Sequence, residues 1–107
     1  MQRDGIQEIT STSGTVTMNN ATGIIYINPA SLAATLTLKF PTVPQDQDVV
    51  SIQFGGTITG VGTVVTALTL SANTGQTLVG TTLTAANAGT STCYQYRASN
   101  TTWYRLY

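Results

Sequence analysis

The stretch AATLTLKF, residues 33–40, alternates large apolar side chains with polar ones. In an extended chain these two kinds of side chain fall on opposite faces: Leu36, Leu38 and Phe40 on one, Thr35, Thr37 and Lys39 on the other. A period of two residues is typical of a β-strand that buries one face and exposes the other. The stretch therefore predicts a strand at the surface of a β-sheet core.

Similar segments recur along the whole chain. We predict strands over residues 6–10, 14–19, 23–28, 33–40, 49–54, 63–72, 77–80, 91–98 and 102–107. Residues 81–90 fit either a short strand or a loop, and the glycine-rich residues 55–62 fit a bent strand or a flexible loop. A short echo links TLTLKF (35–40) with ALTLSA (67–72), and we interpret it as shared strand composition rather than as a repeat.

The spacing of these segments indicates the fold class. Short strands about 8–12 residues apart, separated by clusters of Gly, Asn and Pro, predict an all-β protein, namely an antiparallel β-sandwich that is jelly-roll-like. We expect almost no helix. The chain of 107 residues is long enough for one modest core. We divide it into an N-terminal arm, residues 1–12, and a single β-sandwich domain, residues 13–107.

The composition excludes several classes of partner. Charged residues make up 7% of the chain, four basic and four acidic, against about 25% in average soluble proteins. Nucleic-acid backbones are bound by many Lys and Arg side chains, so we expect no nucleic-acid partner. Apolar runs are short, and the first ten residues lack the apolar segment of a signal peptide, so we expect no membrane partner and synthesis in the cytoplasm without export. So little charge repulsion favours self-association.

The side chains of most enzyme sites are scarce. The chain has no His and one Cys, which excludes Ser-His-Asp triads, His-based metal sites and an intrachain disulfide. We expect Cys93 to be a buried apolar residue, with an intersubunit disulfide or a reactive thiol as alternatives. Asp46 and Asp48 could begin a calcium site or pair as glycosidase carboxylates, but no further ligand follows and a solvated turn is favoured. We predict no enzyme, no catalytic residue, no metal and no cofactor.

Large side chains are concentrated in the last two predicted strands. Five of the eight aromatic residues lie between residues 94 and 107. A hairpin there would carry rings on both faces, and one face would need cover from another copy, because Tyr, Trp and Arg are favoured at interfaces. We therefore predict an oligomer interface at Tyr94, Tyr96, Trp103, Tyr104, Arg105 and Tyr107. The alternative is that these are ordinary core residues.

Four segments resemble the small β-sandwich virion proteins of tailed bacteriophages, both capsid decoration (cement) proteins and fibre-tip domains. They are GTVTMNNATGIIYINPAS (14–31), ATLTLKFPTVPQDQDVVSIQF (34–54), ALTLSANTGQTLVG (67–80) and YQYRASNTTWYRLY (94–107). The resemblance covers most of the chain, and its motifs consist mainly of Thr, Gly and apolar residues. It implies a homotrimer on the outside of the virion.

On this basis we expect a trimeric decoration protein on the capsid exterior that stabilises contacts between major capsid subunits. The arm would reach the capsid through Arg3, Asp4, Ile6 and Glu8, with plain terminal disorder as the alternative. A second function is a receptor- or glycan-binding tip of a tail or head fibre, in which Tyr104 or Tyr107 stacks on sugars of the host surface. A tail or neck component is a third possibility.

Overall fold

The computed structural model describes residues 5–20, 23–29, 31–55 and 63–107, and within these ranges the chain is all-β with no helix, as predicted. Ten strands occur there. Their bounds are Ile6–Ile9 (β1), Thr15–Thr17 (β2), Ile24–Ile27 (β3), Ala33–Lys39 (β4), Val49–Phe54 (β5), Thr63–Ser71 (β6), Thr77–Val79 (β7), Ala86–Asn87 (β8), Ser91–Arg97 (β9) and Thr102–Arg105 (β10). Each predicted strand contains one of them, and the ambiguous stretch 81–90 contains β8. The glycine-rich residues 56–62 lie outside the described residues.

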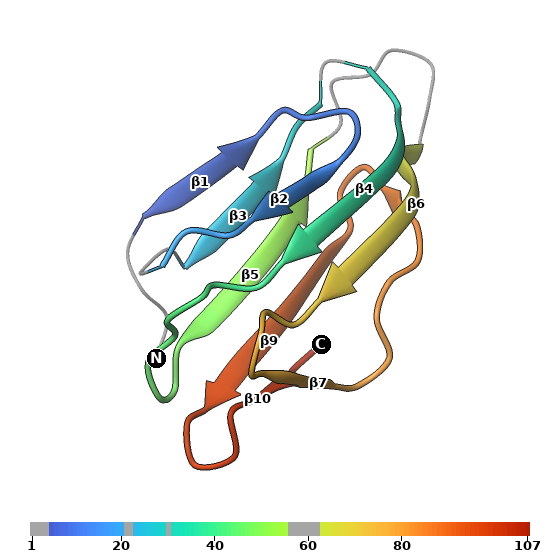
Figure 1. The fold of residues 1–107 in the computed structure, drawn as a ribbon. Coiled ribbons are helices and arrows are strands. Elements are labelled where there is room, and N and C mark those ends of the chain that lie inside the picture. The colour runs from blue at the N-terminus through green and yellow to red at the C-terminus, as the bar shows by residue number, and fades with distance from the viewer. Residues whose placement is uncertain (1–4, 21–22, 30, 56–62) are drawn as a thin grey trace.

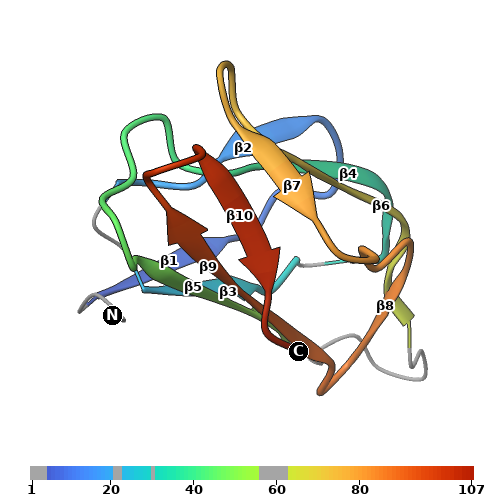
Figure 2. The same ribbon diagram turned by 90° about the horizontal axis from the view of Figure 1, so that it is seen from below.

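The strands form two sheets that face each other, consistent with a β-sandwich (Figures 1 and 2). Sheet A has the order β1-β3-β5-β9-β10-β7, and sheet B has the order β2-β4-β6-β8. The core fills the space between them, because alternate residues of each strand point inward. In β4 these are the predicted Leu36 and Leu38, both at most 1% exposed, and the adjoining Phe40 is fully buried.

The first six strands wind as a coil. Successive strands alternate between the sheets, so β1, β3 and β5 lie side by side in sheet A, and β2, β4 and β6 lie side by side in sheet B. Every pairing within these two sets is parallel. In Figure 1 the chain rises through sheet A at the back and descends through sheet B at the front while it advances to the right. This is the right-handed sense usual for crossovers between parallel strands.

The expected antiparallel pairing is therefore wrong for most of the described strands, and a jelly-roll is not confirmed. Five of the eight strand pairings in the described residues are parallel. The prediction assumed that short connections join neighbours in one sheet, as hairpins do. Here each connection between the first six strands crosses to the opposite sheet, and the strand there serves as the long crossover that parallel pairing needs.

The echo between residues 35–40 and 67–72 also has a structural meaning that we had not assigned to it. In the parallel pair β4–β6, Leu36 lies beside Leu68 and Leu38 lies beside Leu70, each 32 positions further along the chain. On the other side of β4, Val16 of β2 lies beside Leu38. The similar segments are thus neighbouring turns of the coil in register, and stacking of like side chains between turns accounts for their likeness.

The last strands close the sandwich. β9 pairs antiparallel with β5 and with β10, β7 pairs parallel with β10, and β8 pairs antiparallel with β6. Figure 2, seen from below, shows β10 and β7 toward the viewer, at the lower side of the coil. This arrangement brings Trp103 next to Phe40, with ring centroids 4.9 Å apart, although 62 residues separate them along the chain.

The first described residues belong to the domain and do not form a separate arm. β1 pairs with β3, and Ile9 at its end is 3% exposed within the core. The expected boundary between residues 12 and 13 therefore does not match the structure. Gln7 of β1 reaches across to β2, where its Nε2 donates to Thr17 O (3.4 Å) and its Oε1 accepts from Asn19 N (2.7 Å). The amide thus ties the two sheets together at the open end of the coil.

Candidate functional site

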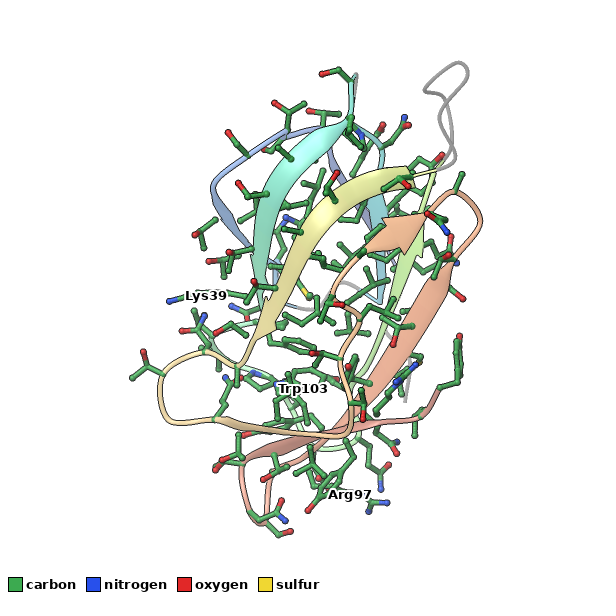
Figure 3. The ribbon with its side chains drawn as sticks, turned by 90° about the vertical axis from the view of Figure 1, so that its right-hand side faces the viewer. Lys39, Arg97 and Trp103 are labelled. Atoms are coloured by element: carbon green, nitrogen blue, oxygen red, sulfur yellow. The ribbon has the colours of Figure 1, made fainter. Side chains whose placement is uncertain are left out.

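Three of the six residues predicted at an oligomer interface lie inside a single protomer. Trp103 and Tyr94 are fully buried, and Tyr96 is 5% exposed. Trp103 contacts Tyr96 and Phe40 with centroid distances of 5.1 and 4.9 Å, and Phe40 meets Tyr94 edge-on at 5.1 Å. Figure 3 shows Trp103 within the sandwich, whereas Lys39 and Arg97 project from its surface. These three rings are core residues and present no surface to another copy.

Polar groups hold Trp103 in place. Its Nε1 donates to Gln76 Oε1 at 2.9 Å, and the Nε2 of the same amide donates to Pro41 O at 2.8 Å. Asn73 Nδ2 donates to Phe40 O at 3.0 Å. The turn before β7 thus binds both the indole and the end of β4. The bond to the indole also satisfies a buried N–H donor, which would destabilise the fold if it had no acceptor.

The other three predicted interface residues are more accessible. Tyr104 is half-buried, and its Oη accepts from Asn100 Nδ2 at 2.6 Å. Arg105 is half-buried: its Nη1 donates to Thr81 O at 2.6 Å, and a Cβ on Gly80 would come within 2.7 Å of its Cβ. Tyr107 is 58% exposed. Of the six, Tyr107 alone is mainly exposed, so an interface built from all six does not exist on this surface.

An apolar row crosses the outer face of sheet A. The row consists of Ile6, Ile24, Ser51, Cys93 and Leu106, which we call the apolar row. The first four are register partners on four adjacent strands, and Leu106 N donates to Cys93 O at 2.8 Å. Ile6 is 68% and Leu106 53% exposed, while the small residues between them are shielded, Ser51 at 7% and Cys93 at 3%. No charged side chain belongs to this row.

Of the four predicted arm residues, two can be placed. Ile6 lies in the apolar row, and exposed Glu8 accepts from Asn28 Nδ2 at 3.2 Å through its Oε2. Arg3 and Asp4 lie outside the described residues. Contact of Ile6 or Glu8 with a capsid stays a prediction.

Cys93 is buried, in agreement with the interpretation as an apolar residue. Burial raises the pKa of its thiol, and a hydrogen bond with Tyr107 lowers it by less. Burial likewise raises the pKa of the neighbouring Tyr94 phenol, against smaller lowering effects of Thr92 and Arg105. Both groups are therefore held neutral in the folded protein.

These two pKa shifts predict a loss of stability in alkali. A raised folded pKa means that the unfolded chain releases its proton first, so stability is complete below the ordinary values of 9.0 and 10.0 and declines as pH rises through the folded values. We expect the free energy of unfolding in urea to be lower at about pH 10.5 than at about pH 8. The Cys93→Ala variant should decline less steeply. An unchanged or rising stability over this range would contradict the burial of the two groups.

The favoured solvated turn is present at Asp46, which is exposed, whereas Asp48 is buried, and both carboxylates make structural contacts. Asp48 is 5% exposed and its Oδ2 accepts from Gln45 N at 2.8 Å. Asp46 Oδ1 accepts from Ala98 N at 2.9 Å. Gln47 between them has a φ of 69° and donates through its N–H to Tyr96 O. The Asp46 carboxylate thus anchors the proline-rich loop to the β9–β10 turn, and the Asp48 carboxylate bonds within the loop itself.

A hollow of about 480 Å³ opens at the end of sheet A where β5 leaves the sheet. It is lined by Tyr26, Gln53, Gly55, Gly89, Thr90 and Ser91, with Phe54 beneath. Tyr26, Gln53 and Ser91 are register partners on three adjacent strands. Sequence analysis missed this feature, because it depends on which glycines the strand register brings together.

Within the described ranges, no group of three or more His, Cys, Asp or Glu side chains could hold a metal ion, and no helix has the length and hydrophobicity to cross a membrane. Comparison of the chain with family models, curated proteins and solved structures found no match.

Proposed function

We propose that the protein is a non-enzymatic structural protein of a tailed-phage virion. In this proposal it forms a homotrimer on the capsid exterior and stabilises contacts between major capsid subunits, with a jelly-roll relationship no longer part of the expectation. The charge-poor composition and the resemblance of four sequence segments support this role. A protein that stabilises contacts between capsid subunits needs surface that it can bury and needs no reactive group. The scarcity of reactive side chains in the sequence fits this role.

The apolar row carries the proposal. Trp103 is buried in the core of one protomer, whereas Ile6 and Leu106 lie outside this core, 68% and 53% exposed. Scattered exposed apolar residues are common. Here, however, register aligns the residues across four strands with no charge among them. Burial of such a surface contributes about 25 cal/mol per Å² before the costs of association.

We thus place the oligomer interface on the outer face of sheet A instead of at the six residues predicted from the sequence. Protomers would meet along the apolar row, and the three joined copies would contact the capsid together. Joining three weak capsid-contacting surfaces raises the overall affinity for the capsid without any new contact, because the second and third binding events are intramolecular.

A charge in the apolar row is expected to prevent association. In Leu106→Asp, a carboxylate would be buried in the interface without a partner, which costs several kcal/mol, so we expect the trimer to dissociate at least 100-fold more readily. Light scattering should report a monomer at concentrations where the unmodified chain is a trimer. The matched control is Val43→Asp, because Val43 is 70% exposed but lies on the proline-rich loop. Equal behaviour of the two variants would exclude the apolar row as the interface.

Cryo-electron microscopy of the virion that carries the chain tests the role itself. We expect threefold density at local threefold positions on the outer surface of the head, with sheet A facing sheet A of the neighbouring copies. Density confined to the tail or neck, or no density on the particle, would reject the decoration function.

A further inference from the structure

The hollow beside Tyr26 arises from two positions without side chains. Along β5, Ser51 and Gln53 point outward, and the next outward position is Gly55. Across from it, Phe54 N donates to Thr90 O and Gly89 N donates to Phe54 O. Two residues, Gly89 and Thr90, therefore face one residue of β5, which is a β-bulge with a glycine of positive φ (84°) in its first position.

The hollow is open beside Gly89 and is closed by the Tyr26 ring beside Gly55. A Cβ added at Gly89 would meet no atom of the described residues within 4 Å, so these residues leave the space beside the bulge open. A Cβ added at Gly55 would collide with the tip of the Tyr26 ring, at 2.7 Å from Cζ. The glycine thus allows the ring to lean over the end of β5 and to form one wall of the hollow, while Thr90 and Ser91 form the opposite wall.

The chemistry of the lining is neutral. It combines one aromatic ring, the amide of Gln53, the hydroxyls of Thr90 and Ser91, and glycine backbone. None of the described residues that line the hollow is a cation. An anionic ligand would therefore gain no ion pair from them.

A sugar ring has the complementary properties. One face of a pyranose presents C–H groups that pack on the negative face of an aromatic ring, and its rim carries hydroxyls that need both donors and acceptors. An amide and two hydroxyls supply both kinds of partner. The volume lies within the range of small-molecule sites and accommodates one or two rings.

We propose that this hollow is a binding site for a neutral glycan, with one pyranose ring against Tyr26 and its hydroxyl groups bonded to Gln53 and Ser91. The site is separate from Tyr104 and Tyr107, which do not line it. All its residues come from one protomer and none belongs to the apolar row. Tyr26, Gln53 and Ser91 form the neighbouring row on the same face of sheet A, so a trimer that meets along the apolar row would lie beside the site.

Titration with named sugars, followed by 1H–15N NMR, tests this site. The probes are glucose, galactose, N-acetylglucosamine, maltose and lactose, with glucuronic acid and N-acetylneuraminic acid as acidic counterparts. We expect at least one neutral probe to bind with a dissociation constant on the order of 1 mM and to shift the amides of Gln53, Gly55, Gly89 and Ser91. The acidic probes should leave these amides unchanged.

Two variants and a matched control assign the binding to the hollow. Tyr26→Ala removes the stacking ring, and Ser91→Phe fills the hollow from its opposite wall with a residue that strands favour, so each should weaken binding at least tenfold. Tyr104→Ala removes a half-buried tyrosine elsewhere on sheet A and should leave binding unchanged. The dispersion of the spectra shows whether each variant is folded. The proposal is overturned if no neutral probe binds, if the shifts centre on Tyr104 or Tyr107, or if Tyr26→Ala and Ser91→Phe, both folded, bind as the unmodified chain does.

Discussion

Replacing Trp103 by alanine is expected to lower the free energy of unfolding by about 3–5 kcal/mol, the usual cost of removing a large buried ring. The indole is fully buried, packs on Phe40 and Tyr96, and donates to Gln76 Oε1. The truncation would leave a cavity and would remove the donor to the Gln76 amide oxygen. Denaturant unfolding followed by circular dichroism measures the loss.

Two further substitutions make this experiment specific. Trp103→Phe keeps a ring but removes the donor to Gln76, and should cost about 1–2 kcal/mol. Tyr104→Ala, on the next residue of the same strand, should cost less than about 1 kcal/mol because its ring is half-buried on the outer face. If Trp103→Ala instead changed the oligomeric mass and left the stability of the fold intact, the ring would belong to an interface.

A second large effect is expected at β1. Ile9→Thr should reduce the free energy of unfolding by about 2–4 kcal/mol, because it removes apolar contacts from the core and buries a hydroxyl there. The matched substitution Ile6→Thr, on the same strand, should stay within about 0.5 kcal/mol. Ile9 is 3% exposed and Ile6 is 68% exposed. Since threonine is favoured in strands, a difference between the two cannot come from strand propensity.

Unfolding in urea at low protein concentration, where association contributes little, measures both variants. Similar small effects at the two positions would restore the description of residues 6–9 as an arm. A large effect at Ile9 alone would confirm that the first strand is part of the domain and that its removal would damage the fold as well as any contact made by the arm.

The positions of the strands could be predicted from local pattern, because alternation reports which residues face a core. Leu36, Leu38 and Phe40 are buried as their spacing indicated. The direction of pairing could not be predicted in this way, since a half-buried strand has the same period in parallel and antiparallel sheets. The echo between residues 35–40 and 67–72 was the available signal, and it is explained by two parallel strands in register.

Whether the aromatic side chains are buried or exposed depends on contacts between residues distant in the sequence. The pattern correctly placed Tyr94 and Tyr96 on one face of their strand, but it did not show that Phe40 and Trp103 would meet them. Because these contacts were not visible in the sequence, the hairpin was predicted to need cover from another copy. The hollow beside Tyr26 was equally out of reach, because Gly55 and Gly89 are ordinary turn residues until the bulge brings them to one site.

The contact between Phe40 and Trp103 also bears on how the protein is made. The coil can begin to wind while synthesis proceeds, but the space beside Phe40 stays open until Trp103, which comes 63 positions later in the sequence, has been made. A nascent or prematurely terminated chain would thus expose Phe40 and the adjoining core, which makes incomplete products prone to aggregation and to proteolysis.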